Sequence, residues 1–363
     1  MKILEIIPQL SSGGAERFTV DLCNELARTD EVTLVVLHRL EGNNFYLSQV
    51  DEKVRVVSME KRPGFDWRLF FRLCRLIRRA KPDVVHTHLR GIVYAFFAES
   101  GIVHGVRYVH TVHSAASKEA AEWLSRNIRR WLFRSGRCTA VTISPDSHRS
   151  FVEFYGVDAP MIPNGRNVPQ DLEVSEGVKA EFRAYRVTER TRVVVCLARI
   201  DPVKRQTLLA RVADRLCREG RDLTLLLIGS TKIKELVQEI EALQCPRIHV
   251  LGERQNPLEY LKAADAYCLF SSYEGLPISL IEALGVGCVP VCTPAGGMKN
   301  LIADGRNGLL APGFTEEACY ATLRRFLDLP AERLAQMKAA ALESYAPYSM
   351  SECARRYREL FGK

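Results

Sequence analysis

Residues 266–284 read AYCLFSSYEGLPISLIEAL, and this stretch decides the fold. The apolar run 266–270 has the length of a buried strand, and the apolar spacing from Ile278 onward is typical of a helix. Gly275 permits a tight turn between them, and Pro277 suits the first position of a helix. Strand, glycine turn and helix together are typical of a parallel α/β sheet. The backbone N–H groups at such a helix start form a binding site for an anion.

The same alternation of short β-branched runs and longer amphipathic segments continues on both sides of this unit. In the first half, strands are predicted at 2–8, 32–37, 84–88, 106–112 and 140–143. In the second half, they are predicted at 192–198, 223–228, 247–251, 266–270 and 289–291. The pattern predicts two Rossmann-like, doubly wound α/β domains that face a central cleft.

A stretch rich in turn formers, 161–169, marks the predicted hinge between the domains. We therefore assign residues 1–165 to an N-terminal domain and 166–348 to a C-terminal domain. The amphipathic segment 349–363 either caps the second domain or crosses back to pack on the first. The sequence leaves both positions open.

The composition is that of an ordinary globular protein and excludes several classes. The net charge of +8 over 363 residues suits phosphates, nucleotides or anionic lipid, and it is too small and too dispersed to indicate nucleic-acid binding. The eleven cysteines are scattered without a CxxC pair, as in a reduced cytosolic protein. No apolar run approaches the roughly 18 residues that span a bilayer. Glu5 and Pro8 interrupt the first residues before a signal-peptide core, so we expect a cytoplasmic protein.

Two glutamates flank the turn of the opening stretch. Glu274 precedes the turn and Glu282 lies about one helical turn after it, so both carboxylates can face one ligand. A carboxylate accepts two hydrogen bonds, which suits the vicinal hydroxyls of a ribose or another sugar. The alternative is that Glu274 caps the helix and Glu282 is solvated. We interpret the pair as ligand-binding because it lies on a strand, turn and helix.

Two cations follow the predicted strand 192–198. Arg199 ends the strand and Lys204 comes five residues later, at the start of a predicted helix over 204–218. Arg199 by a bidentate contact and Lys204 as a point charge can hold a diphosphate. The alternative is an ion pair of Arg199 with Asp201 and an ordinary helix lysine. The helix dipole disfavours a cation at this end, so Lys204 indicates an anionic ligand.

The first strand leads into a pair of glycines, Gly13 and Gly14, where the backbone can approach a ligand closely. This is not a GxGxxG motif, and no acidic residue of a dinucleotide site follows about 20 residues later. A dehydrogenase is therefore disfavoured.

Four histidines lie at the carboxyl ends of two predicted strands: His86, His88, His110 and His113. They can hold a metal, serve as structural residues or make polar contacts to a substrate. Their spacing matches no metal-binding motif, so a substrate contact or a structural role is favoured. His113 is the best placed of the four for a substrate.

Residues Trp67–Lys81 form a predicted amphipathic helix with arginines on one side and an apolar stripe that includes Trp67, Phe70 and Phe71. It is either a core-facing helix with a solvated basic face or a contact with anionic lipid. Five arginines further along the chain would add to a lipid contact: Arg126, Arg129, Arg130, Arg134 and Arg137.

Taken together, these segments resemble the family 4 retaining glycosyltransferases of the GT-B fold over essentially the whole chain. The most specific similarity is the run from Glu274 to Glu282, which is similar to that family's two glutamates separated by seven residues. Arg199 and Lys204 resemble its diphosphate-binding pair. The family's acceptor-side loops and interdomain turn are matched with decreasing specificity by Gly13-Gly14-Ala15-Glu16, His86-Thr87-His88, Thr111-Val112-His113 and Pro163-Asn164-Gly165.

The resemblance implies a role for each matching residue. Glu282 would bind the donor ribose, Glu274 would lie beside the donor sugar, and Arg199 and Lys204 would hold the diphosphate. Gly14 would let the first domain close on the diphosphate, and His113 would contact the donor sugar near the reacting carbon. The remaining donor-binding positions are Glu253, Gly275, Leu276 and Pro277, and the acceptor-side positions are Gly13, Glu16, His86 and His88. The chain departs from the family at Ala198, usually Gly, and at Arg205, usually a small residue.

The expected activity is retaining transfer of a hexosyl or N-acetylhexosaminyl group from a nucleotide-sugar, most simply a UDP-sugar. The acceptor would be a glycan or lipid-linked glycan of cell-surface polysaccharide biosynthesis, at the inner face of the membrane. No DxD triplet is present for a divalent ion, so we expect no metal and no cofactor. The alternatives are a GT-B-fold UDP-sugar epimerase and a non-catalytic nucleotide-sugar-binding subunit.

Overall fold

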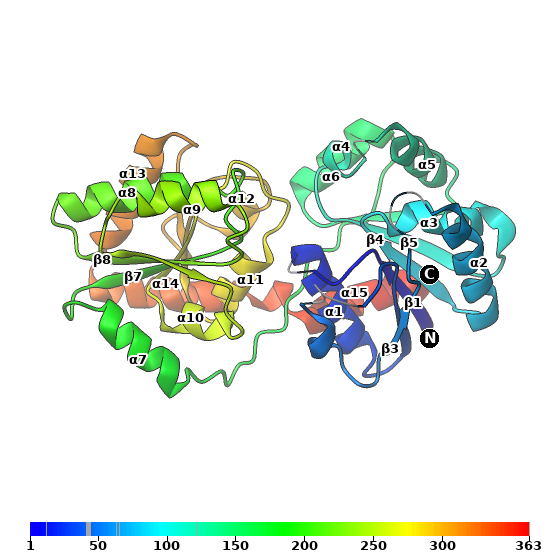
Figure 1. Cartoon of the computed structure of the whole chain (residues 1–363), viewed down its shortest axis with the longest axis horizontal. Coiled ribbons are helices and arrows are strands. Elements are labelled where there is room, and N and C mark those ends of the chain that lie inside the picture. The colour runs from blue at the N-terminus through cyan, green and yellow to red at the C-terminus, as the bar shows by residue number, and fades with distance from the viewer. Residues whose placement is uncertain (12, 41–44, 63, 65, 121, 363) are drawn as a thin grey trace. The chain divides into compact units, whose positions relative to one another are not determined.

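The computed structural model describes residues 1–11, 13–40, 45–62, 64, 66–120 and 122–362. The chain forms two compact units (Figure 1). Unit 1 consists of Met1–Asn167 together with Tyr348–Lys363, and unit 2 of Val168–Pro347. The predicted boundary after residue 165 falls within two residues of the observed one. Lys363, the end of the predicted segment 349–363, lies outside the described residues.

Unit 1 is built on a parallel sheet of six strands in the order β3-β2-β1-β4-β5-β6. The strands are β1 (Lys2–Ile7), β2 (Glu31–Val36), β3 (Arg55–Ser58), β4 (Val84–His88), β5 (Arg107–Val112) and β6 (Thr139–Thr142). The order reverses between β1 and β4, which is the doubly wound arrangement predicted from the sequence. Because ligands bind where the order reverses, the loops after these strands are the informative part of the unit.

Helices cover both faces of this sheet. The helices of unit 1 are α1 (Gly14–Leu26), α2 (Trp67–Ala80), α3 (Gly91–Phe97), α4 (Ala116–Glu119), α5 (Trp123–Arg134), α6 (Pro145–Tyr155) and α15 (Met350–Gly362). Within the described residues, three short turns accompany these helices and those of unit 2: η1 (Leu47–Gln49), η2 (Ala98–Ile102) and η3 (Ala346–Tyr348). Helices α2, α3, α5 and α6 pack in a row on one face, and α1 packs with α15 on the other (Figure 1).

The last helix, α15, returns to unit 1. It lies beside α1, where its Tyr357 is fully buried and its hydroxyl hydrogen-bonds Oγ1 of Thr111 on β5 at 2.7 Å. Arg107 also donates to the carbonyl of Leu360 at 2.9 Å. Of the two positions that the sequence left open for this segment, the structure therefore has the one on the N-terminal unit.

Unit 2 repeats the same design, with the strand order β12-β11-β10-β7-β8-β9. Its strands are β7 (Arg192–Leu197), β8 (Leu223–Ile228), β9 (Ile248–Gly252), β10 (Ala266–Leu269), β11 (Val289–Cys292) and β12 (Leu309–Leu310). The order reverses between β7 and β10. The loops after these two strands are therefore neighbours, although they are about 70 residues apart in the sequence.

The helices of unit 2 also form two layers. They are α7 (Glu176–Tyr185), α8 (Gln206–Arg218), α9 (Lys234–Glu241), α10 (Pro257–Ala263), α11 (Ile278–Gly285), α12 (Met298–Leu301), α13 (Glu316–Leu327) and α14 (Ala331–Glu343). Helices α8, α9 and α13 lie on one face, and α7, α10, α11 and α14 on the other (Figure 1).

The structure differs from the sequence prediction at the sheet edges and at two helix starts. Strands β3 and β12 were not predicted, because β3 is only half-buried and β12 has two residues, so neither has a clear apolar period. Pro277 precedes α11 as its N-cap and is not its first residue. Helix α8 begins at Gln206, so Lys204 lies in the preceding turn. Within the described residues, no helix has both the length and the apolar character needed to cross a bilayer.

Candidate functional site

The strand reversal in unit 2 brings together the two loops that the sequence singled out. The loop after β7 carries Arg199 and Lys204, and the loop after β10 carries Glu274. Lys204 Nζ lies 2.5 Å from Oε1 of Glu274, and Ser271 Oγ donates to the same oxygen at 2.7 Å. Glu274 and Ser271 are buried. The site therefore contains an ion pair between a partly exposed lysine and a buried glutamate at the carboxyl edge of the sheet.

The second glutamate, Glu282, is buried within α11. The interpretation of the two glutamates as a helix cap and a solvated side chain is therefore wrong. Glu274 makes no capping hydrogen bond to α11, and it bonds Lys204 and Ser271 instead. Burial of an acidic side chain costs free energy unless a cation or a hydrogen-bond donor pairs with it, and Glu274 has both kinds of partner in Lys204 and Ser271.

Glycines shape the backbone around Glu274. A Cβ on Gly296 would lie 1.7 Å from the carbonyl oxygen of Glu274, and Gly296 has φ of +50°. Its neighbour Gly297 donates its N–H to the carbonyl of Gly275 at 2.7 Å. The hydroxyl of Thr293, directly after β11, donates to the carbonyl of Ser271 at 2.6 Å. The segment after β11 thus holds the Glu274 loop through its backbone.

The loop after β7 is organised by buried Gln206 at the start of α8. Its Nε2 donates to the carbonyl of Arg199 at 2.7 Å, while its Oε1 accepts from the N–H of Asp201 at 3.3 Å. Arg199 itself is 63% exposed, and its Nε lies 3.4 Å from Oδ2 of Asp201. In this structure Arg199 therefore makes the surface ion pair with Asp201 that the sequence analysis gave as the alternative.

The two departures from the family pattern occupy defined places in this loop. The carbonyl of Ala198 lies against Gly229, where a Cβ would come within 2.2 Å of it. The close approach of the two backbone segments therefore depends on the missing side chain of Gly229, and not on a glycine at position 198. Arg205 adopts a left-handed conformation with φ of +56° at the N-cap of α8, and its guanidinium donates to the carbonyl of Phe314 at 2.8 Å.

The other predicted donor-binding positions lie on the same edge of unit 2. Leu276 and Pro277 are buried between Gly275 and the first turn of α11. Glu253 is exposed directly after β9, whose last residue Gly252 accepts from the N–H of Gly229 at 3.0 Å.

In unit 1, the glycine pair forms the start of α1. Gly13 is the N-cap and Gly14, which is exposed, is the first helical residue. Glu16 is buried over this turn and accepts from Ser11 Oγ at 2.8 Å. A Cβ on Gly13 would lie 2.2 Å from Oε2 of Glu16, so glycine is needed for the side chain to fold back. A carboxylate near a helix N-terminus is stabilised by the helix dipole.

Two of the predicted acceptor-side residues, His86 and His88, are fully buried beneath α1 and α15. Nδ1 of His86 lies 2.9 Å from Oε2 of buried Glu5, and Nε2 of His88 lies 2.8 Å from the same oxygen. Nε2 of His86 contacts Oγ1 of Thr111 at 2.8 Å. Because their ring nitrogens bond other protein groups and neither ring is exposed, the structure does not place them on an acceptor surface. This corrects the sequence prediction.

Glu5 is the charge at the centre of this cluster. Burial raises the pKa of Glu5, but the neighbouring His86 and His88 outweigh it and lower that pKa to about 2. Burial, followed by repulsion from His86, lowers the pKa of His88 to about 4. The carboxylate is thus ionised and His88 is neutral near neutral pH.

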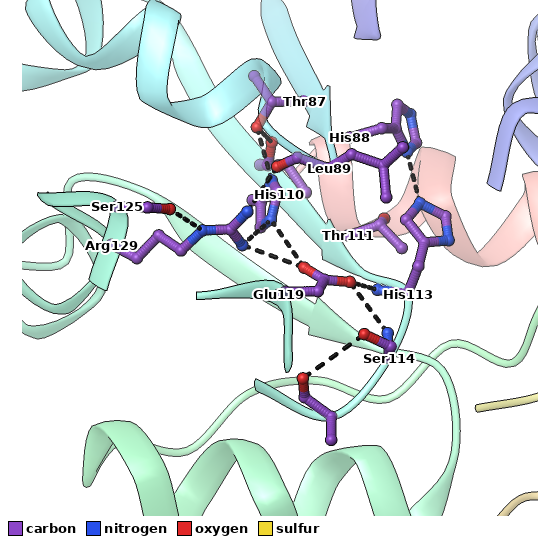
Figure 2. Close-up of polar contacts among 12 residues, drawn as sticks. Thr87, His88, Leu89, His110, Thr111, His113, Ser114, Glu119, Ser125 and Arg129 are labelled. Atoms are coloured by element: carbon purple, nitrogen blue, oxygen red, sulfur yellow. Dashed lines mark hydrogen bonds and ion pairs between the residues drawn. The ribbon is translucent and has the colours of Figure 1, made fainter. Parts of the chain in front are cut away.

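His113 follows β5 and, unlike the other three histidines of the cluster, is only partly buried. Its Nε2 lies 3.0 Å from Nδ1 of His88 (Figure 2). Its backbone N–H donates to Oε1 of Glu119 at 2.5 Å, and the N–H of Ser114 donates to the same oxygen at 2.9 Å. Glu119 therefore holds the turn that carries His113.

Arg129 of α5 holds Glu119 in turn. This arginine was predicted to belong to a basic surface, but it is buried, and its guanidinium donates in several directions (Figure 2). Nη1 reaches Oε2 of Glu119 at 3.1 Å and Nε2 of His110 at 2.8 Å, and Nη2 reaches the carbonyl of Leu89 at 2.6 Å. The network joins the loops after β4 and β5.

A metal-binding group is also conceivable from geometry alone. In the part of the chain that the structure describes, ligand atoms of Glu5, His86 and His88 lie within 4.8 Å of one another. The same atoms hydrogen-bond each other at 2.8 to 3.1 Å. Their positions are therefore explained without a metal.

The chain matches two families of known proteins. A family described as glycosyl transferases group 1 matches residues 178–344, and one described as glycosyltransferase family 4 matches residues 12–169. The chain belongs to the family 4 glycosyltransferases.

Two curated relatives of this glycosyltransferase have names that specify the sugar they transfer and the substrate they act on. One, from Campylobacter jejuni, is the α-1,4-N-acetyl-D-galactosaminyltransferase acting on GalNAc-α-(1→4)-GalNAc-α-(1→3)-diNAcBac-PP-undecaprenol. It is 26% identical over 323 residues, which are 85% of this chain and 84% of the relative. The other is the Escherichia coli UDP-Gal:α-D-GlcNAc-diphosphoundecaprenol α-1,3-galactosyltransferase. It is 23% identical over 68% of this chain and 66% of the relative.

A solved structure shows the same fold. Anabaena HepE in complex with UDP and glucose superposes with a TM-score of 0.84 at 19% identity, covering 100% of this chain and 99% of that one. The glycosyltransferase thus has the GT-B fold that the sequence predicted, and its family favours sugar transfer over the epimerase and the non-catalytic subunit.

Sequence reasoning did not find several residues of these networks in the glycosyltransferase. They are Glu5, Ser271, Glu119, Gln206, Gly229, Gly296 and Gly297. Gly296 and Gly297 are adjacent glycines a few residues after a buried strand, a signal that resembles the one at Gly13 and Gly14. For Glu5, an acidic residue within an apolar strand was the available signal.

Proposed function

We propose that this glycosyltransferase transfers a hexosyl or N-acetylhexosaminyl group from a UDP-sugar to a lipid-linked glycan, with retention and without a divalent metal. The observation that supports the donor-binding part of the proposal is the ion pair between Lys204 and buried Glu274, on the loops where the strand order of unit 2 reverses. Relatives and a structural neighbour supply the chemical classes. Two relatives are named for undecaprenol-linked substrates, and HepE was crystallised with UDP and glucose.

The leaving group of this reaction is a nucleoside diphosphate whose negative charge grows as the sugar leaves. Charge stabilisation by preorganised cations and helix dipoles is the largest contribution to catalysis in many such reactions. Lys204 at a fixed position, exposed Arg199 and the start of α11 are the groups available in unit 2. We assign the diphosphate to Lys204 and Arg199, the ribose to Glu282 and the donor sugar to Glu274.

Retention then follows a front-face route, in which the leaving phosphate accepts the proton of the acceptor hydroxyl as the new bond forms. No protein nucleophile is required for this route. The proposal is tested by the anomeric configuration of the product, determined by NMR from its first formation. An inverted product would refute the retaining assignment.

The donor class is tested by thermal stability. Because a ligand that binds only the native state raises its stability by mass action, the correct nucleotide raises Tm. UDP, GDP, ADP and CMP are compared with and without magnesium, on the wild type and on Glu282→Gln. We expect a shift with UDP that does not depend on magnesium and is lost in Glu282→Gln. A shift only with magnesium would refute the metal-independent proposal, and no shift with UDP would refute the donor assignment.

We further assign the acceptor side to a membrane surface formed by α2 and α5, which both pack on α3. Trp67 and Phe71 were predicted to belong to the apolar stripe of α2, yet each is 58% exposed, while Leu69 and Leu73 face the core. On α5, Trp123 is 74% exposed. Exposed aromatic side chains among arginines are typical of proteins that lie on anionic bilayers.

The membrane assignment is tested with vesicles that contain phosphatidylglycerol. We expect the protein to float with these vesicles, to be released as salt rises, and to bind more weakly when Trp67 and Trp123 are both changed to Ser. Val187→Ser, which removes a 66% exposed apolar residue from unit 2, is the control. Flotation that is equal in both variants would refute the surface.

A further inference from the structure

We propose that the buried chain from Glu5 through His88 fixes the neutral tautomer of His113, so that Nδ1 of His113 is presented to the substrate as a hydrogen-bond acceptor for a sugar hydroxyl. Glu5 and His88 are thereby positioning residues, and neither touches the substrate. The inference rests on the proposed function for the identity of the ligand, but the tautomer itself does not depend on it.

The direction of the first hydrogen bond is set by Glu5. An ionised carboxylate accepts hydrogen bonds and cannot donate them. The low pKa of about 2 keeps Glu5 ionised, so the 2.8 Å contact with its Oε2 requires the proton to be on Nε2 of His88. Nδ1 of His86 lies 2.9 Å from the same oxygen and donates in the same way.

The direction of the second bond follows from the first. A neutral imidazole has one donor and one acceptor nitrogen. Since Nε2 of His88 carries the proton, its Nδ1 has only a lone pair, and the partner at 3.0 Å must donate. That partner is Nε2 of His113. Burial lowers the pKa of His113 well below its ordinary value, so its ring is neutral and its Nδ1 is an acceptor.

The groups around His113 agree with this assignment. On the side of α1, its ring packs edge-on against Phe18 at 5.6 Å between centroids, which offers no polar atom. From β4 it meets His88, and from α4 the Glu119 carboxylate binds its backbone N–H and not its ring. Figure 2 shows one ring nitrogen bonded to His88 and the other directed away from it. Among the described residues, no group hydrogen-bonds Nδ1 of His113.

A second hydrogen-bond network nearby also fixes a histidine tautomer, that of His110, because one of its partners can only donate. Arg129 can only donate, so Nε2 of His110, at 2.8 Å from its Nη1, must be an acceptor. Nδ1 of His110 then carries the proton and donates to Thr87 Oγ1 at 2.9 Å. The Thr87 hydroxyl donates its own hydrogen bond to the carbonyl of Val109 at 3.2 Å.

The tautomer decides what His113 can recognise. An acceptor nitrogen binds a hydroxyl group, whereas a phosphate oxygen would require an N–H donor. The substrate group at His113 is therefore a sugar hydroxyl and not the diphosphate. A sugar in which fluorine replaces the hydroxyl at His113 loses this contact, because fluorine cannot donate a hydrogen bond.

The tautomer is measured directly by NMR of the histidine ring nitrogens in protein labelled with ¹⁵N-histidine. The signal that disappears in His113→Asn belongs to His113. We expect a protonated Nε2 and an unprotonated Nδ1 near neutral pH. His88→Leu removes the acceptor for Nε2 and should give a mixture of tautomers, while His249→Leu in unit 2 should change nothing. A proton on Nδ1 of His113 in the wild type would overturn the proposal, whether or not the variants fold.

The ligand contact is measured by the affinity for UDP-glucose, UDP-galactose and UDP-N-acetylgalactosamine relative to UDP alone. In His113→Asn the amide oxygen can take the place of Nδ1, whereas in His113→Gln the amide nitrogen takes the place of Nε2 and nothing replaces Nδ1. We expect the Gln variant to bind its best UDP-sugar about tenfold more weakly, with UDP affinity unchanged, and the Asn variant to be less affected.

These outcomes separate the two proposals. A loss of UDP affinity equal to the loss of UDP-sugar affinity, or no loss in His113→Gln, overturns the hydroxyl contact. A wild type that binds no UDP refutes the proposed function. The NMR result decides the tautomer in either case.

Discussion

The ion pair between Lys204 and Glu274 offers the sharpest test of the donor site. We expect Lys204→Met to reduce sugar transfer by two to three orders of magnitude, because it removes a positive charge that stabilises the leaving diphosphate. Loss of one preorganised donor of this kind costs about 2.7–4 kcal/mol in the transition state. Arg199 is 63% exposed and solvent screens its charge, so it does not replace the fixed lysine.

The same change also affects stability, and the structure indicates by how much. Nζ of Lys204 lies 2.5 Å from a buried carboxylate whose remaining side-chain partner is Ser271 at 2.7 Å. A buried charge that loses its partner costs on the order of 3 kcal/mol. The double variant Lys204→Met/Glu274→Gln removes the orphaned charge, so it should recover most of this stability while transfer stays low.

The assay separates these effects. Initial rates are measured with saturating UDP-sugar, and the free energy of unfolding is measured by urea titration. Lys234→Met, which removes an exposed lysine at the start of α9, serves as the matched control and should behave as the wild type. A folded Lys204→Met enzyme with wild-type turnover would remove Lys204 from the mechanism.

Three further changes test other parts of the structure. Both carboxylate oxygens of buried Glu99 lack a hydrogen-bond partner, and burial, opposed by Arg129, raises its pKa well above 4.5. Since the folded state binds this proton more tightly, stability falls as pH rises above 4.5, and Glu99→Gln should gain stability over the wild type in urea titrations between about pH 5 and about pH 8; parallel pH profiles would contradict this. Gly296→Ala should weaken UDP binding measured by calorimetry, because its Cβ would lie 1.7 Å from the carbonyl of Glu274, while Gly313→Ala, with open space around it, should not. Arg129→Lys should lower the unfolding free energy by on the order of 3 kcal/mol, because one ammonium cannot span the partners that the guanidinium reaches; an unchanged urea midpoint would show that the network is not needed.

Much of the fold could be predicted because buried parallel strands are continuous apolar runs. The strand predicted over 84–88 matches β4, and the helix predicted over 67–80 matches α2. Edge strands such as β3 lack this signal, since one side of each is not covered. Helix α2 was placed correctly along the chain, but its buried face was not, because Trp67 and Phe71 are apolar and yet exposed.

The donor-side residues could be found because they follow strands within single loops. Glu274, Glu282 and Lys204 each lie within a few residues of a clear strand or helix, so their local context was visible in the sequence. The contacts that these residues make could not be predicted from the sequence. The pairing of Lys204 with Glu274, and the burial of His86 and His88 around Glu5, join segments about 70 to 80 residues apart in the chain.

The sequence by itself determined the alternation of strands and helices, and with it the two doubly wound units and the loops in which ligand-binding residues lie. Local periodicity and turn chemistry act over a few residues, and they are sufficient to determine these elements and their order along the chain. Only the tertiary structure decided which loops meet, where α15 packs, and which histidine nitrogen carries a proton. The protonation of His113 is set by Glu5, more than a hundred residues earlier in the chain, through His88. A hydrogen bond has a donor and an acceptor, so its direction is known only when all its partners are in place.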